Sequence, residues 1–242
     1  MKHLPCFLIT VCLLLAACPP PQGSGERVEL ESDGWVVVGD LQVPASDEPV
    51  PAVLMLHMMP TVRSSYIRLA DLFAERGIAS LRIDLRGHGE STNLGGHNRE
   101  VNARAWRDVV AALDFLRSRE GVIDPARLGV LGASYSGEHA ARAGREGCDI
   151  ATYAILSSGG FSEESIAFVG SGEAPWLFVA ARDDGERTPA LMERAAAAAG
   201  ERGELIMYDA GGHGTYLFSV YSDLEERIAD WFADRLSGPV DW

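Results

Sequence analysis

Short apolar runs alternate along the chain with longer segments whose apolar residues recur every three or four positions. The run PAVLMLH at residues 51–57 is apolar throughout, which is typical of a strand buried on both faces of a sheet. The next segment, residues 64–77, has the apolar spacing of a helix and ends at Gly77, a residue type that commonly ends helices. This alternation predicts an α/β fold, with a mostly parallel central sheet and helices on both faces.

The same two patterns predict the remaining elements. Residues 34–44 have the pattern of an antiparallel edge hairpin or of one long strand. Further strands are expected at residues 78–84, 127–133, 149–158, 175–181 and 204–210. Further helices are expected at residues 101–120, 188–200 and 222–236. Thr188 is predicted to cap the second of these helices, and a capping box of Ser222 and Glu225 is predicted to begin the third.

Length and charge limit the classes of function. The 242 residues, 47% of them hydrophobic, suit one α/β domain with its own core, which we place at residues 28–242. The formal net charge of -14 repels phosphate backbones, so a nucleic acid is not expected as a partner. The sequence contains neither a CxxC pair nor an HExxH motif, and therefore no zinc signature.

The first residues have the pattern of an export signal. A short basic start is followed by an apolar run that is too short to span a membrane comfortably, and then by small residues before Cys18. The stretch LAAC at residues 15–18 resembles the lipobox of bacterial lipoproteins, in which the signal is cut before a cysteine that then carries lipid. The resemblance implies a signal peptide at residues 1–17, lipid on Cys18 and a tether at residues 18–27. It also implies an exported protein of the cell envelope, on the periplasmic or outer-membrane side, held to the membrane by its lipid; the alternative is an ordinary signal peptide with an incidental cysteine.

A serine lies between a predicted strand and a predicted helix. Residues 132–137 read GASYSG, and they follow the expected strand directly. This stretch resembles the nucleophile elbow G-x-S-x-G of the α/β-hydrolase family, with Ser134 as the nucleophile and Ser136 at the position where the family has glycine. A sharp turn there brings backbone segments close together, which requires small neighbours. The alternative interpretation is a plain turn serine.

The α/β-hydrolase resemblance extends to an acid and a base, because the family places serine, acid and histidine in this order, each after a strand. The acid usually lies three residues after a small residue that ends its strand, and counting from Ala181 points to Asp184, with Asp183 as the alternative. His213 lies in a glycine-rich loop after the last expected strand, as the family's histidine does. The resemblance therefore implies a triad of Ser134, Asp184 and His213 that needs no cofactor and no metal; the alternative for each is an ordinary loop residue.

Two further segments resemble parts of the family. Residues 53–65 resemble the His-Gly-x loop that lends a backbone N–H to the oxyanion, although Met58 replaces the glycine. By position, Met59 is expected to supply that N–H and Tyr135 the second; the alternative is that Met58 and Met59 are only wall residues of an apolar pocket. Residues 83–91 are close to the family's Asp-x-Arg-Gly-x-Gly-x-Ser segment, and we interpret them as structural.

The chemistry implied by the resemblance is hydrolysis of carboxylic esters of small molecules through an acyl-enzyme. Residues 159–174 are too few for a multi-helix cap, so we expect an open site similar to that of dienelactone-hydrolase-like or small carboxylesterase members. The natural ester, its acyl length and the oligomeric state are left open. Two alternatives are a peptidase or thioesterase with the same triad, and a non-catalytic surface lipoprotein that binds a partner. Candidate pocket walls are Phe161, Phe168, Trp176 and Tyr216, and the alternative for each, which is the default for an aromatic residue, is a place in the core.

Overall fold

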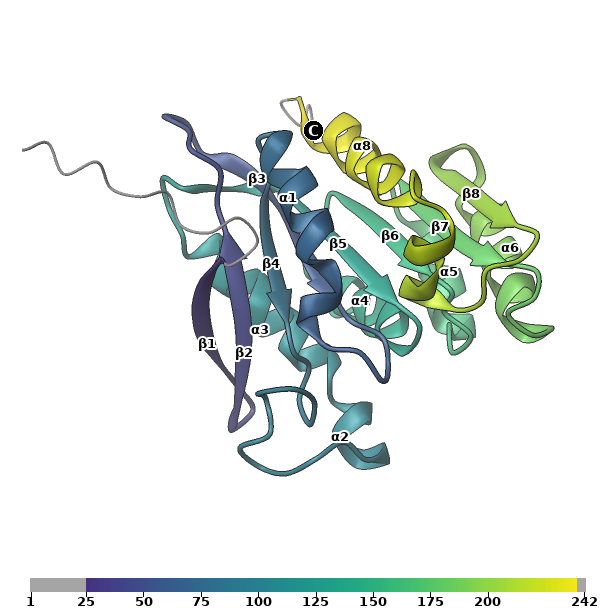
Figure 1. Cartoon of the computed structure of the whole chain (residues 1–242), viewed down its shortest axis with the longest axis horizontal. Coiled ribbons are helices and arrows are strands. Elements are labelled where there is room, and N and C mark those ends of the chain that lie inside the picture. The colour runs from purple at the N-terminus through teal and green to yellow at the C-terminus, as the bar shows by residue number, and fades with distance from the viewer. Residues whose placement is uncertain (1–24, 239–242) are drawn as a thin grey trace, which may run out of the picture.

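An eight-stranded sheet runs through the centre of the protein in the computed structural model, which describes residues 25–238 (Figure 1). The strands are β1 (Glu26–Ser32), β2 (Trp35–Gln42), β3 (Val50–Leu56), β4 (Ala79–Ile83), β5 (Ile123–Ala133), β6 (Thr152–Leu156), β7 (Trp176–Ala181) and β8 (Gly203–Tyr208). Their order is β1-β2-β4-β3-β5-β6-β7-β8. β2 pairs antiparallel with both β1 and β4, and the other neighbours are parallel. The predicted fold class, an α/β-hydrolase fold with a mostly parallel sheet, is confirmed.

Helices cover both faces of this sheet. The α-helices are α1 (Ile67–Glu75), α2 (Arg99–Ala103), α3 (Trp106–Arg117), α4 (Tyr135–Arg145), α5 (Glu163–Ser171), α6 (Arg187–Ala199), α7 (Leu217–Val220) and α8 (Leu224–Leu236). Short 3-10 turns are η1 (Arg63–Tyr66), η2 (Gly200–Arg202) and η3 (Gly214–Tyr216). In Figure 1, α1 and α8 lie in front of the sheet, and α3, α4 and α6 lie behind it. The connection between β6 and β7 holds one helix, α5, which packs against α4 and α6 and forms no multi-helix cap.

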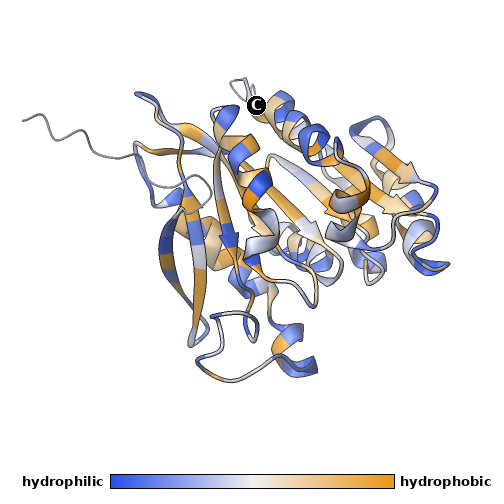
Figure 2. Ribbon diagram, viewed as in Figure 1, coloured by the Kyte–Doolittle hydropathy of each residue, from blue (hydrophilic) through white to orange (hydrophobic). Residues whose placement is uncertain are grey.

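Successive strand residues divide between two buried clusters, as the pleat of a strand requires. On β3, Leu54 and Leu56 belong to the cluster beneath α3 and α4, whereas Val53 and Met55 belong to the cluster beneath α1 and α8. All four side chains have no exposed surface. Both faces of β3 are therefore buried, which explains why the sequence of this strand is apolar throughout. Figure 2 shows hydrophobic residues along the central strands and hydrophilic residues on the outer sides of the helices.

One predicted helix, residues 101–120, is divided in the structure. α2 and α3 are separated by a turn at residues 104–105, where backbone bonds span three residues instead of four: the N–H of Arg107 donates to the carbonyl of Arg104, and that of Asp108 to Ala105. The apolar spacing continues through this break because α3 buries Val109 beneath the sheet. None of the five residues of α2 is buried, so packing does not hold it in line with α3.

The predicted caps differ as well. α8 begins at Leu224 without the expected box of Ser222 and Glu225, because the Glu225 carboxylate instead pairs with Arg68 on α1. α6 begins at Arg187, so Thr188 lies inside the first turn and is buried rather than capping the helix. Glu225 thus makes a tertiary contact in place of the local cap that its sequence motif predicted.

The expected signal peptide at residues 1–17 and the lipidation site Cys18 lie outside the described residues. Strand β1 begins at Glu26, so the last two residues of the expected tether, residues 26–27, pair with Leu41 and Asp40 of β2. Within residues 25–238, no helix combines the length and the apolar character that a membrane crossing requires.

Candidate active site

Ser134 occupies a sharp turn between β5 and α4. Its backbone has φ 57° and ψ -125°, in a region that costs a residue other than glycine about 1–3 kcal/mol. The surrounding structure holds it there, because its N–H donates to the carbonyl of Leu156 at 2.7 Å and its carbonyl accepts from the N–H of Gly137 at 3.1 Å. The turn lies at the carboxyl end of β5, at the edge of the sheet where ligands of such folds bind.

Two glycines allow the backbone to turn this tightly. A Cβ added to Gly132 would lie 2.9 Å from the Cα of Gly137, closer than real Cβ atoms approach. A Cβ added to Gly137 would lie 2.9 Å from both Ile155 and Ser158 on the neighbouring strand and loop. The small residues around Ser134 are therefore required by backbone contact, as the sequence pattern indicated.

Ser136 stands where the family motif has glycine, and the structure gives it a role. The side chain is fully buried. Its Oγ accepts from the N–H of Ala133 at 2.9 Å and lies within donor distance of two carbonyls, Ala133 at 2.8 Å and Leu56 at 2.9 Å. The hydroxyl therefore ties the end of β5 to the end of β3.

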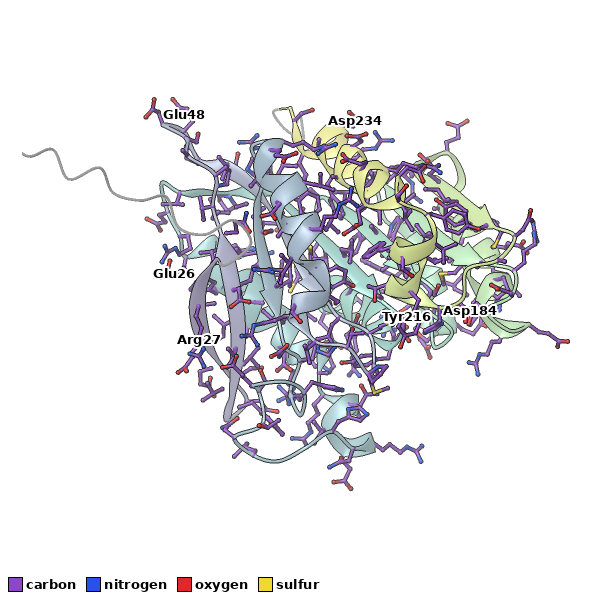
Figure 3. The ribbon with its side chains drawn as sticks, viewed as in Figure 1. Glu26, Arg27, Glu48, Asp184, Tyr216 and Asp234 are labelled. Atoms are coloured by element: carbon purple, nitrogen blue, oxygen red, sulfur yellow. The ribbon has the colours of Figure 1, made fainter. Side chains whose placement is uncertain are left out.

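Three side chains from separate loops form one continuous hydrogen-bonded chain. His213 Nε2 lies 2.7 Å from Ser134 Oγ. His213 Nδ1 lies 2.8 Å and 2.7 Å from the two carboxylate oxygens of Asp184. Because a carboxylate only accepts, Nδ1 carries the proton and donates it to Asp184, which leaves the Nε2 lone pair facing the serine hydroxyl. Figure 3 labels Asp184 just beyond β7, at the carboxyl end of the parallel strands.

The two neighbouring aspartates have different contacts. Asp183 accepts the backbone N–H groups of Gly212 at 3.0 Å and of Gly211 at 3.1 Å. These bonds, the one from Gly212 first, lower the pKa of Asp183 below its ordinary value. Asp183 thus holds the loop that carries His213, whereas Asp184 contacts the imidazole itself. The geometry agrees with the count from Ala181, which pointed to Asp184.

The loop after β3 places Met58 and Met59 beside this chain of residues. The Met58 side chain is buried against Gly214, because a Cβ on that glycine would lie 2.5 Å from the Met58 sulfur. The Met58 carbonyl accepts from Thr61 Oγ1 at 2.9 Å and from His57 Nδ1 at 3.0 Å. Since the peptide is planar and trans, the N–H of Met59 points away from both of these donors. Tyr135 begins α4, so its N–H is among the groups that have no partner inside the helix.

His57 clamps this loop to the next one. Its Nε2 accepts the N–H of Leu85 at 3.1 Å while Nδ1 donates to the Met58 carbonyl, so both ring nitrogens are used. Burial lowers the pKa of His57 to about 4, which keeps the ring neutral. Asp84 adds a second clamp: its carboxylate accepts the backbone N–H of Arg63 at 2.8 Å and of Glu90 at 3.0 Å. These contacts give residues 83–91 the structural role that we expected.

Four of the five histidines within residues 25–238 surround Tyr135. The ring of Tyr135 lies 5.6 Å from those of His88 and His139, 6.1 Å from His57 and 6.2 Å from His97, measured between centroids. The sequence pattern did not reveal this cluster, because its members come from three separate segments: the loop after β3, the connection between β4 and α2, and helix α4. Across residues 25–238, no group of histidine, cysteine or acidic side chains is arranged to hold a metal ion.

The expected pocket walls lie mainly in the core. Trp176 stacks on Tyr153 with 3.8 Å between ring centroids, and Phe161 is 2% exposed, so neither forms a surface that a ligand contacts. Phe168 packs edge-on against Trp176, partly buried. Tyr216 is the exception, 51% exposed and three residues after His213. A surface hollow of about 690 Å³ lies between β1 and α3, and Ser134 is not among its lining residues.

Comparison with known proteins identifies the family of the chain. A family described as "Serine aminopeptidase, S33" matches residues 47–183, more than half of the chain. The 2,6-dihydropseudooxynicotine hydrolase of Paenarthrobacter nicotinovorans is 29% identical over 147 residues, which cover 61% of this chain and 38% of that protein. The chain spans less than half the length of the curated relatives that it matches.

Solved structures show the same fold at low identity. The Pyrococcus furiosus esterase Pf2001 superposes with a TM-score of 0.70 at 20% identity, covering 92% of this chain and 97% of that one. Est1E of Butyrivibrio proteoclasticus, solved with ferulic acid, superposes with a TM-score of 0.73 at 16% identity, covering 87% of this chain and all of the other. The strand order, the turn at Ser134 and the family match together lead to one conclusion: the chain belongs to the S33 serine aminopeptidase family of α/β-hydrolases.

Proposed function

We propose that this hydrolase cleaves carboxylic esters of small molecules through an acyl-enzyme on Ser134. The observation that carries the proposal is the unbroken hydrogen-bonded chain from Ser134 Oγ through His213 to Asp184. A serine hydroxyl is a poor nucleophile until a base removes its proton, and the Nε2 lone pair faces that proton at 2.7 Å.

Each step has a residue to perform it. Ser134 Oγ attacks the ester carbonyl carbon as His213 Nε2 takes its proton, and Asp184 stabilises the imidazolium that forms. The N–H groups of Met59 and Tyr135 bind the oxyanion, and each such donor is worth about 2.7–4 kcal/mol. His213 then returns the proton to the departing alcohol, which leaves an ester on Ser134. A water molecule, activated by the same histidine, attacks that ester, and the acid leaves as Ser134 recovers its proton.

Several observations favour esters among the possible acyl substrates. The short connection through α5 leaves the site without a multi-helix cap, which supports the expected likeness to dienelactone-hydrolase-like and small carboxylesterase enzymes. Structures with the same fold bear the name esterase. Peptides and thioesters are the alternative substrates, because the family is described as an aminopeptidase, a relative from Bacillus subtilis is called a peptidase, and one from Aspergillus aculeatus is called a thiohydrolase. Both substrate classes are therefore included in the test below. A non-catalytic role is disfavoured, because a pure binding protein does not require the hydrogen-bonded chain at Ser134.

The proposed location rests on the sequence alone. We propose that the protein is exported and held at the cell envelope by lipid on Cys18, with residues 18–25 as a spacer before β1. The lipobox-like stretch supports this proposal, and so does its position directly after the apolar run.

Labelling with a fluorophosphonate probe, followed by a panel of matched ester, thioester and aminoacyl amide substrates, tests the proposed chemistry. The wild-type protein should be labelled and should hydrolyse short esters fastest, and Ser134→Ala should lose both labelling and turnover. Ser158→Ala is the matched control, because this serine is also buried near the turn yet its hydroxyl makes no hydrogen bond within residues 25–238. Labelling that persists in Ser134→Ala, or a clear preference for amides, would contradict the proposal.

A further inference from the structure

Two polar atoms next to the nucleophile are buried and unpaired. Within residues 25–238, neither Tyr135 Oη nor His139 Nδ1 has a hydrogen-bond partner. His139 is only 6% exposed, and its ring stands perpendicular to that of Tyr135 with 5.6 Å between centroids. A buried polar group without a partner costs about 1–3 kcal/mol, so each of these atoms calls for an explanation such as a ligand that pairs with it.

The two atoms are complementary in hydrogen-bonding character. His139 Nε2 lies 3.1 Å from Asn102 Oδ1, which only accepts, so Nε2 carries the ring proton. Burial lowers the pKa of His139 to about 4, so the ring is neutral near pH 7 and its Nδ1 is a free lone pair. The Tyr135 hydroxyl has a proton to donate. A ligand hydroxyl group that reached both atoms would accept from Tyr135 Oη and donate to His139 Nδ1, and would satisfy both.

The order of the strands places this pair on the acyl side of the proposed reaction. Ser134 follows β5 in the middle of the sheet, and His213 approaches it from the β8 side. The departing alcohol takes its proton from His213, so it lies on that side. The acyl group extends the other way, toward β3 and β4, where Tyr135 faces His57 and His88.

Helix α2 covers the pair loosely. Its residue Asn102 contacts His139, yet none of its five residues is buried. A hollow of about 690 Å³ separates this helix from the body of the protein, with Val101 on one side and Trp35 and Arg86 on the other. Figure 1 shows α2 on a long loop at the margin of the molecule. Because such a segment has few buried contacts, its displacement costs little free energy, and this displacement would give a ligand access to Tyr135 Oη and His139 Nδ1.

We propose that Tyr135 and His139 form a subsite for one hydroxyl group on the acyl part of the substrate, reached when α2 moves aside. The proposal rests on the proposed ester hydrolysis and narrows its substrate class to esters of hydroxylated acids. Tyr135 thus has two separate roles: its backbone N–H serves the oxyanion, and its side chain selects the acyl group.

The test uses 4-nitrophenyl esters of straight-chain acids of six to ten carbons, each with and without a terminal hydroxyl. We expect the ratio of kcat/KM, hydroxylated over unsubstituted, to exceed about tenfold at the chain length that fits. Tyr135→Phe and His139→Phe keep the rings and remove one hydrogen-bonding atom each, and each should lower that ratio about fivefold. Ratios near one along the whole series, or ratios unchanged in both variants, would overturn the proposal.

A second readout separates selectivity from folding. Because Tyr135 Oη makes no hydrogen bond within residues 25–238, Tyr135→Phe should unfold no more easily than the wild-type protein. Tyr66→Phe is the matched control, since that buried hydroxyl donates to the Leu56 carbonyl at 3.0 Å and its loss should destabilise the fold. Destabilisation of Tyr135→Phe as large as that of Tyr66→Phe would show that the hydroxyl is already partnered, and the subsite would be ruled out. A wild-type protein that hydrolyses none of these esters would instead disprove the proposed function and the subsite with it.

Discussion

Restoring the family motif should weaken this protein. In Ser136→Gly, the N–H of Ala133 loses the acceptor that it has at 2.9 Å, inside a fully buried turn. Leaving that donor unpaired costs about 1–3 kcal/mol, and a glycine in the first turn of α4 adds about 0.5–1 kcal/mol of backbone entropy. We therefore expect the free energy of unfolding to fall by about 1.5–4 kcal/mol.

Chemical unfolding measured by circular dichroism gives this difference directly. Ser136→Ala is the matched control, because it removes the hydroxyl and keeps the Cβ, and it should lose only the hydrogen-bonding part, about 1–3 kcal/mol. Loss of the tie between Ala133 and Leu56 should also reduce turnover, since both residues end strands beside Ser134. A Ser136→Gly protein that is as stable as the wild type would refute this account of the turn.

Three further predictions concern the acid, the buried histidines and the anchor. Asp184→Asn should reduce kcat on esters by up to about 10⁴-fold through loss of tautomer control, and steady-state kinetics should show a much smaller loss for Asp183→Asn, which leaves the imidazole contact in place. Burial lowers the pKa of His57 and His139 to about 4, so between pH 6.5 and 4 the unfolded chain binds more protons than the folded protein does. The free energy of unfolding should therefore fall as the pH drops from about 6.5 to 4. Denaturant titrations should show a shallower fall in His139→Phe. Cys18→Ser should move the protein out of the membrane fraction on cell fractionation, and retention there after signal cleavage would contradict the lipid anchor.

The sequence was sufficient for the fold and for much of the candidate site, because the relevant signals are local. Apolar runs predicted the six strands β3 to β8, and a count of three from the end of one of them separated Asp184 from Asp183. The turn glycines also follow from short-range backbone contact. What these signals share is that each depends on residues a few positions apart.

The features that escaped prediction depend on contacts between distant segments. The cluster around Tyr135 draws residues from three segments, and His57 bridges two loops through a single backbone N–H. The pairing of the buried Glu225 carboxylate with the half-exposed Arg68 replaced a cap that the local motif predicted. Likewise, the sequence shows Ser136 only as a departure from the family motif, whereas in the structure its hydroxyl lies within hydrogen-bond distance of the carbonyl of Leu56, 80 positions away.

Strand β1 has a consequence for how copies of this protein meet. It forms one margin of the sheet, with backbone groups on its outer side that could pair with another strand. Its exposed positions carry Arg27, Glu29 and Glu31, beside buried residues of the opposite face. Two copies that joined their sheets along β1 would bring acidic residues of chains with net charge -14 against each other. The charges on β1 therefore oppose the association of two copies of the protein along this strand.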